Sequence, residues 1–235
     1  MRQRFNPMMI VMLALLATWA FRGMNNFDSP MDWVMQKVYI LPGILVGLSF
    51  HEFAHAWVAK KLGDDTAERQ GRVTINPAAH LDIVGFVSLL VLGFGWGIPV
   101  PVDERNFKHP RRDNILVSLA GVTMNLLLAV IFSIPARMIV KAFSGAAPSD
   151  LVYNVYLMIF YVVSINVVLM IFNLIPCPPL DGWGIITQIF RLDKYSWWYK
   201  VYQYGTWILL ALIVFNVTDR IITPLVSTLL GILLY

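Results

Sequence analysis

Residues 38–59 read Val-Tyr-Ile-Leu-Pro-Gly-Ile-Leu-Val-Gly-Leu-Ser-Phe-His-Glu-Phe-Ala-His-Ala-Trp-Val-Ala, an apolar stretch whose one charged residue is Glu52. His51 and His55 are one helical turn apart, so both imidazoles lie on one helix face and can bind one zinc ion. Glu52 then lies beside the metal, where a carboxylate can accept a proton from the attacking water. Burying these three side chains in hydrocarbon is costly, so the cluster indicates a functional site. The stretch predicts a hydrolase that works within a bilayer; the alternative is a helix whose histidines bond to neighbours.

Composition also indicates a membrane protein. Hydrophobic residues make up 58% of the 235 positions, charged residues make up 14%, and the mean hydropathy is +0.66. About a quarter of the residues of a soluble domain are charged, so this composition excludes an ordinary soluble protein. The net charge is +4, but the basic residues fall in short loops between apolar segments, which indicates membrane orientation and not nucleic-acid binding. The single cysteine, Cys177, excludes an intrachain disulfide and a Cys-rich metal site.

Apolar segments and polar loops alternate along the chain, and no internal repeat or separate soluble domain interrupts them. The segments cover residues 8–21, 38–59, 83–100, 115–140, 151–175, 206–217 and 221–235. We therefore expect one integral-membrane domain over residues 1–235, an all-α polytopic helix bundle of about five to six transmembrane helices. The first segment follows Arg2 and Arg4 as a signal peptide would, but no A-x-A cleavage pattern follows it, so we expect a retained helix.

The segment at residues 83–100 carries four glycines and Pro99, all of which weaken a helix. If this segment spans the membrane, the Lys and Arg residues divide 8 against 9 between the two sides. If it dips in and returns to the same side, they divide 13 against 4, with Arg220 left aside. The positive-inside rule favours the second division. We therefore predict a re-entrant segment whose flanking loops are cytoplasmic.

Two histidines leave zinc in need of a third protein ligand. That ligand must reach their depth, which is roughly 8 to 14 Å below the cytoplasmic interface if the helix ends near Lys60. In the re-entrant arrangement the chain returns to this side just before Asp181, which follows Pro176, Pro178 and Pro179. The prolines prevent a helix and hold the carboxylate on a stiff segment. Asp181 is thus the predicted third ligand; otherwise it is a solvated aspartate of an interfacial loop.

Other side chains compete with Asp181 for this role. Asp64 and Asp65 follow a glycine at an expected helix end and fit a solvated turn better. His80 precedes the re-entrant segment, and its imidazole could cap that segment or face the cleft. Cys177 fits a small apolar filler better than a ligand, because a carboxylate is available beside it.

The motifs together resemble the site-2 protease family of intramembrane zinc metalloproteases, in its minimal form without an added regulatory domain. The resemblance covers about residues 47–183. Beyond the zinc motif it rests on four blocks, namely Gly71-Arg72-Val73-Thr74-Ile75-Asn76-Pro77-Ala78-Ala79-His80-Leu81-Asp82, Pro99-Val100-Pro101-Val102, Ala120-Gly121-Val122-Thr123-Met124-Asn125, and the stretch from Asn173 to Gly182. The sequence departs from the family at Val122, where the family has proline, and this affects the expected helix geometry there.

The resemblance implies one Zn²⁺ per chain, bound by His51, His55 and Asp181, with Glu52 as the catalytic base. It also implies a catalytic core at about residues 38–183 and a transmembrane protein as the substrate. The expected location is a prokaryotic cell membrane, with the active site nearer the cytoplasmic face.

Four residues are candidates for substrate binding. Asn125 and Asn173 look like the polar residues that the family places around the substrate, although Asn125 could instead bond across two helices and Asn173 could satisfy backbone groups freed by the prolines. The stretch at residues 72–75 has a strand-like composition. We expect a short β-hairpin there, near the active site, whose edge at Thr74 pairs with an unwound substrate, with His80 beside it.

Two other functions compete with proteolysis. A non-proteolytic membrane scaffold could retain the fold, but it would not need Glu52 together with three metal ligands. A metal transporter would carry its ligands on several helices along a path, whereas the candidates here gather at one depth beside a base.

Overall fold

The computed structural model describes residues 18, 24–25, 27–93, 95–143 and 148–235. Within these ranges four helices are long and apolar enough to cross a membrane, namely α2 (Pro30–Lys61), α5 (Pro110–Ala142), α6 (Asp150–Asn173) and α9 (Val217–Leu234). The prediction of an all-α polytopic membrane protein is confirmed, with four candidate crossings. The first predicted segment, residues 8–21, lies outside the described residues except for Thr18.

Shorter helices connect the long ones. These are α3 (Thr66–Arg69), α4 (Ile83–Leu92), α7 (Asp181–Phe190), α8 (Ser196–Val214) and the 3-10 turns Pro77–Ala79, Glu104–Asn106 and Leu192–Lys194. The chain turns from α8 into α9 at Asn216, whose φ is +55°. Helix α5 continues without a break through Val122, which has the backbone N–H that the expected proline would lack.

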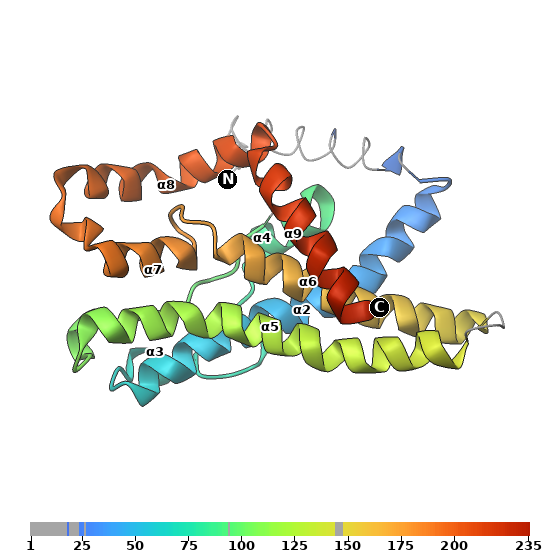
Figure 1. Ribbon diagram of the computed structural model, residues 1–235, viewed down its shortest axis with the longest axis horizontal. Helices are drawn as coiled ribbons and strands as arrows, with labels where there is room; N and C mark the ends of the chain where they lie inside the picture. Colours follow the sequence, from blue (N-terminus) through green and yellow to red (C-terminus); the bar gives the residue numbers. More distant parts are fainter. Residues whose placement is uncertain (1–17, 19–23, 26, 94, 144–147) are drawn as a thin grey trace, which may run out of the picture.

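The centre of the fold is the three-helix group α2, α5 and α6. Helices α5 and α6 run along the long axis, α2 crosses them obliquely, and α9 packs on α6 (Figure 1). Small residues allow this close packing. A Cβ added to Gly43 would lie 2.7 Å from the Tyr161 carbonyl oxygen on α6, and one added to Gly47 would lie 2.7 Å from Leu169 Cδ1. Glycines at helix crossings allow backbones to approach in this way. The zinc-motif helix α2 is therefore held directly against α6.

Helix α4 belongs to a segment that leaves the bundle and returns to its starting point. Asp82 caps the helix by accepting a hydrogen bond from Gly85 N, and Gly93 ends it in the left-handed conformation with φ +74°. The Ile98 N–H then donates to the His80 carbonyl oxygen at 2.7 Å. This bond joins the two ends of the segment, at a point that we call its neck. Ten helical residues extend about 15 Å, half of a hydrocarbon core.

The predicted β-hairpin is wrong for the part of the chain that the structure describes. That part contains no strand, and its one β-type pairing is an isolated antiparallel bridge between Leu81 and Gly97. Residues 72–75 are irregular because no second segment pairs with their backbone. The Arg72 side chain makes the cross-connection instead, by donating to the Ile98 carbonyl oxygen at 2.6 Å.

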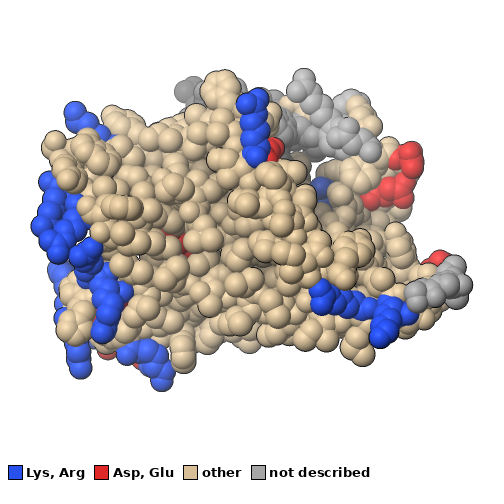
Figure 2. Space-filling model, in the orientation of Figure 1, with Lys and Arg blue, Asp and Glu red and all other residues tan. Residues whose placement is uncertain are grey.

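Basic side chains gather at one end of the molecule. Figure 2 shows most Lys and Arg residues at the end where, in Figure 1, α2 stops and α5 begins. The loop that joins these two helices, residues 62–109, therefore starts and finishes at the same end. This is the arrangement that the charge division along the sequence favours.

Asp64 joins the end of α2 to the loop before α5. It is fully buried, and its carboxylate accepts hydrogen bonds from the N–H and hydroxyl of Thr66, from Asp103 N and from Asn106 Nδ2. The expectation of a solvated turn is wrong for Asp64, because these donors replace water. The neighbouring Asp65 does fit it, since this residue is half-exposed and only pairs with a surface arginine.

We expect Asp64→Asn to destabilise the protein. Burial alone would raise the pKa of the Asp64 carboxyl, but the hydrogen bonds from Thr66, Asn106 and Asp103 outweigh burial and hold that pKa below its ordinary value. A lowered folded-state pKa stabilises above the unfolded value of about 3.9, and this contribution is lost as pH falls through the folded-state value. At pH 7 the substitution should reduce the free energy of unfolding by about 1 to 3 kcal/mol.

Thermal unfolding in detergent measures this effect. The control is Asp65→Asn, an exposed ion-pair change that should cost less than about 0.5 kcal/mol. The gap in Tm between wild type and Asp64→Asn should narrow below about pH 4. Equal Tm values for the two variants at pH 7 would contradict the role given to Asp64.

Candidate active site

Three metal-binding side chains converge between α2 and the start of α7. His51 Nε2 and His55 Nε2 are 3.0 Å apart, and Asp181 Oδ2 lies 3.3 Å from the first and 3.4 Å from the second. Both histidines are buried, and Asp181 is the first residue of α7. The structure therefore brings together the three residues that the sequence analysis selected, although Asp181 follows His55 by more than a hundred positions.

Hydrogen bonds on the far side of each imidazole fix which nitrogen carries the proton. His51 Nδ1 faces Asn125 Oδ1 at 2.7 Å, and His55 Nδ1 faces the Val117 carbonyl oxygen at 2.7 Å. Both oxygens are acceptors, because the Asn125 amide nitrogen already donates to Gly47 O. Each Nδ1 is therefore the protonated nitrogen, and both Nε2 lone pairs point into the site. This is the usual arrangement of zinc-bound histidines.

The converging atoms fit a cation. Two unprotonated Nε2 atoms and a carboxylate oxygen would repel one another at these distances. Asp181 Oδ2 is also buried without a hydrogen-bond partner among the described residues. Two imidazoles and one carboxylate form a ligand set typical of catalytic zinc, which leaves a further coordination position for water or substrate. The residues present therefore fit the metal that the sequence implies.

Gly121 on α5 makes room for this site. A Cβ at this position would lie 2.5 Å from His51 Cε1 and 2.5 Å from His55 Nε2. Any side chain here would displace the imidazoles. The α5 backbone therefore packs directly against the histidine pair. This close approach also brings the Val117 carbonyl within hydrogen-bond distance of His55.

A proline-flanked segment holds the Glu52 carboxylate. Glu52 Oε2 accepts a hydrogen bond from the Val100 N–H at 2.9 Å. Pro99 and Pro101 have no N–H, so Val100 supplies the only backbone donor in this tripeptide. Arg72 holds the same segment by donating to the Ile98 and Pro99 carbonyl oxygens, at 2.6 and 3.4 Å. One carboxylate oxygen is thereby bound and the other remains available.

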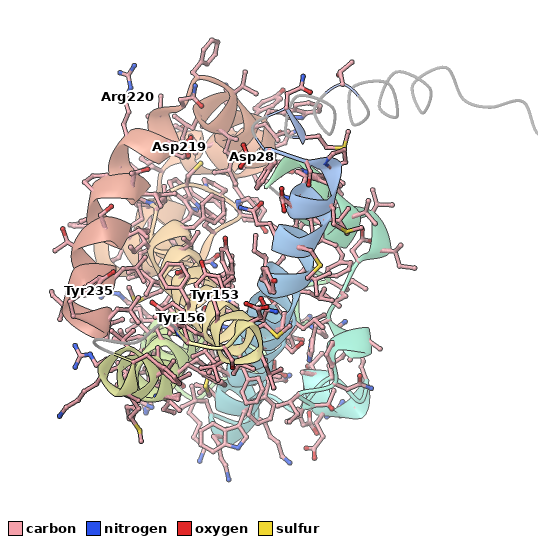
Figure 3. All side chains as sticks on the ribbon, turned by 90° about the vertical axis from the view of Figure 1, so that its right-hand side faces the viewer. Asp28, Tyr153, Tyr156, Asp219, Arg220 and Tyr235 are labelled. Atoms are coloured by element: carbon pink, nitrogen blue, oxygen red, sulfur yellow. The ribbon has the colours of Figure 1, made fainter. Side chains whose placement is uncertain are left out.

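The site opens into a cavity of about 390 Å³. Its lining includes the Glu52, His55 and Asp181 side chains, together with Asn173 and Tyr202. A second cavity, of about 270 Å³, lies at the opposite end of the bundle, where Tyr153 and Tyr156 approach Tyr235 (Figure 3). The described lining of that second cavity contains no His, Cys, Asp or Glu side chain. The first cavity is therefore the candidate site for chemistry.

Comparison with known proteins agrees with the geometry. The chain is 38% identical over 196 residues to the Bacillus subtilis protein "Putative zinc metalloprotease YwhC", covering 80% of this chain and 86% of that protein. It is 32% identical over 171 residues to "Putative zinc metalloprotease MJ0611" of Methanocaldococcus jannaschii, covering 73% and 78%. It is 27% identical over 223 residues to "Putative zinc metalloprotease Rip2" of Mycolicibacterium smegmatis, covering 92% and 83%. No family model and no solved structure matches the chain.

The chain belongs to the site-2 protease family. It is a zinc metalloprotease, since the curated relatives bear that name and the His51, His55 and Asp181 side chains form a matching metal-binding group. The resemblance stated from the sequence motifs is thereby confirmed. In this site-2 protease the zinc motif lies inside a helix long and apolar enough to cross a membrane.

The two asparagines expected at the substrate lie in different surroundings. Asn125 is fully buried behind His51, and its amide also donates to Asn166 on α6. It therefore orients a histidine of the protease site where a substrate-facing amide was expected. Asn173 does line the cavity, but its amide nitrogen donates to the Leu169 carbonyl oxygen one turn earlier. Its amide oxygen is the part left for a substrate.

Thr74 and His80 do not line the cavity. His80 is fully buried, and its Nε2 donates to the Thr74 carbonyl oxygen at 2.7 Å. The two residues tie together the neck from which α4 departs, as the Ile98 bond to the His80 carbonyl also does. His80 is not among the residues that converge on Asp181. A direct role of either in substrate binding stays a prediction.

Sequence reasoning missed several residues of this protease site. Val100 and Val117 act through backbone groups, so their side chains gave no signal. Tyr202 and Asn114 border the cavity from α8 and α5, and only the packing of those helices brings them there. Asn166 could have been found, because an amide in a long apolar segment indicates a specific partner.

Replacing Gly121 by alanine should remove zinc. The added Cβ would clash with both imidazoles, so His51 and His55 could not keep their places. We expect zinc per chain, measured by mass spectrometry, to fall at least tenfold under dialysis against a weak chelator. The matched control is Gly231→Ala on α9, where nothing lies within 4 Å of an added Cβ. Equal zinc retention by the two variants would contradict this account.

Proposed function

We propose that the protein hydrolyses peptide bonds in or near the transmembrane helices of other membrane proteins. The observation that carries this proposal is the depth of the site along α2, since His51 and His55 lie within a candidate crossing. A protease whose metal ligands belong to a membrane helix reaches bonds that soluble proteases cannot. The expected setting is the cell membrane of a prokaryote.

The proposed mechanism assigns a role to each residue of the site. His51, His55 and Asp181 would hold one zinc ion per chain, which would polarise the scissile carbonyl and make water a stronger nucleophile. Glu52 would accept the proton of that water and pass it to the departing amide nitrogen. The Val100 N–H holds one oxygen of Glu52 in place, so the other oxygen carries the proton.

The substrate must unwind before it reaches the site, because a helix hides its carbonyl oxygens in hydrogen bonds. Residues 99–102 form neither helix nor strand, and Pro99, Val100 and Val102 border the cavity beside Glu52. We propose that the unwound substrate lies along this segment. Residues 72–75, for which the sequence suggested this role, would act indirectly, through the hold of Arg72 on the Ile98 and Pro99 carbonyls.

We place the basic end of the molecule on the cytoplasmic side, following the positive-inside rule. Helix α4 then enters the bilayer from that side as a re-entrant segment and returns at Ile98. Such irregular backbone is acceptable at membrane depth only where protein or water covers it. The site would lie nearer the cytoplasmic face, from which water would enter.

Metal and activity measurements test the roles separately. We expect Glu52→Gln to retain one zinc per chain but to lose more than about a hundredfold in cleavage rate, because glutamine cannot accept a proton. His51→Ala, His55→Ala and Asp181→Ala should each lose zinc. The probe is a fluorogenic polypeptide with one apolar membrane segment containing a Gly-Pro pair. Zinc loss in Glu52→Gln, or full zinc retention in Asp181→Ala, would reject the assignments.

Cysteine labelling tests the membrane arrangement. Single cysteines at Arg69, Lys108 and Lys194, in a Cys177→Ser background, should react with an impermeant reagent from the cytoplasmic side. A cysteine at Ser149 should react from the other side. Opposite labelling of positions 69 and 108 would mean that residues 83–100 cross the membrane, and the re-entrant arrangement would then be wrong.

A further inference from the structure

One side chain at the active-site cavity has no role in the metal site or the base. Asn114 lies on the first turns of α5 and borders the same cavity as Glu52, His55 and Asp181. Only 9% of its surface is exposed. Its Nδ2 atom is buried and has no hydrogen-bond partner among the described residues. Buried amide groups nearly always have partners, so this donor indicates a missing acceptor.

The neighbours of Asn114 do not supply that acceptor. The adjacent Asp113 carboxylate is already occupied, because it accepts from His109 N and from the Arg112 guanidinium. The Val117 carbonyl oxygen, one turn further along α5, accepts from His55. Asn114 thus lies on the helix face that touches the metal site. Because its Nδ2 atom is covered in the free protein, the side chain must turn to present the amide to a group that enters the cavity.

The segment proposed to lie along the substrate is short of donors. Pro99 and Pro101 have none, and the Val100 N–H is used by Glu52. Among residues 99–102 only the Val102 N–H is then left as a backbone donor for a substrate carbonyl. Backbone carbonyls without partners are costly in a partly buried site, so an additional donor from elsewhere in the lining would favour substrate binding.

We propose that Asn114 is a substrate-binding residue, whose side-chain amide donates a hydrogen bond to a backbone carbonyl oxygen of the unwound substrate. A backbone carbonyl is present whatever the substrate sequence, so this contact would select for an extended conformation and not for a particular side chain. The inference rests on the proposed function, since it requires an unwound polypeptide in the cavity.

A purely structural role for Asn114 makes the opposite prediction for stability. A structural asparagine loses its partners when replaced, so the protein unfolds more easily. An amide without a partner in the free protein has no such bond to lose, and an apolar side chain of the same size is tolerated or stabilising. Asn114→Leu should therefore keep the Tm and the zinc content of the wild type.

The substrate measurements should change in that variant. With the fluorogenic polypeptide containing one apolar segment with a Gly-Pro pair, we expect Asn114→Leu to raise KM ten- to a hundredfold and to alter kcat less than threefold. A bond made equally in the bound and transition states affects KM in this way. Binding of the uncleaved polypeptide, measured by fluorescence anisotropy in a Glu52→Gln background, should weaken by the same factor. Asn114→Ala serves as the second variant if leucine does not fit.

The matched control is Asn154→Leu on α6. Asn154 Oδ1 accepts a hydrogen bond from the Tyr39 hydroxyl at 2.8 Å, and Asn154 does not line the active-site cavity. We expect the reverse pattern for this control, with a lower Tm and an unchanged KM.

The outcomes separate this inference from the proposed function. Wild-type KM and affinity in both Asn114 variants would overturn the inference alone, as would a lowered Tm with unchanged affinity. If the wild-type, zinc-loaded protein neither binds nor cleaves the polypeptide, the proposed function fails and the inference with it.

Discussion

The rest of the structure depends on the close approach of two imidazole nitrogens and one carboxylate oxygen inside an apolar helix bundle. His51 Nε2, His55 Nε2 and Asp181 Oδ2 lie within 3.4 Å of one another. Lone pairs so close together repel one another unless a cation lies among them, so this arrangement suits a bound metal ion. Several features support this arrangement, among them the bare backbone at Gly121 and the amide of Asn125.

Glu52, the proposed base, is held by different means from the two histidines. Both imidazoles are held by partners on α5, namely Asn125 Oδ1 and the Val117 carbonyl, whereas Glu52 is held by the Val100 N–H of an irregular segment. That segment is anchored at its neck by the His80 carbonyl and by the Arg72 guanidinium. Asp64 fastens the next part of the same loop to the end of α2. An irregular segment can present carbonyls and an N–H toward the cavity more readily than a helix, most of whose backbone groups bond to one another.

The membrane imposes a second constraint, which concerns polar groups. Unpaired backbone and amide groups are costly in hydrocarbon, so a buried amide in a long helix is expected to have a partner. Asn166 on α6 donates to the Val162 carbonyl and accepts from Asn125. Because Asn125 also bonds to His51, these contacts link α6 to that histidine. Ser49 Oγ on α2 and the Asn114 amide on α5 are buried without partners among the described residues, and of these two only Asn114 borders the cavity, where a substrate would supply the partner.

The sequence by itself indicated the membrane class and the zinc motif, and it predicted Asp181 as the residue that joins the two histidines, where the structure places it. Hydropathy, charge division and ligand spacing are local properties or sums over the chain, so they can be read without coordinates. Only the tertiary structure decided what surrounds the site. The β-hairpin predicted from the strand-like composition of residues 72–75 was wrong, because a strand requires a partner backbone and none of the described residues supplies one there. The roles of Asn125, Val100 and Asn114 depend on which helix faces and backbone groups meet across the bundle. These tertiary contacts join residues that are distant in the sequence, so local composition does not predict them.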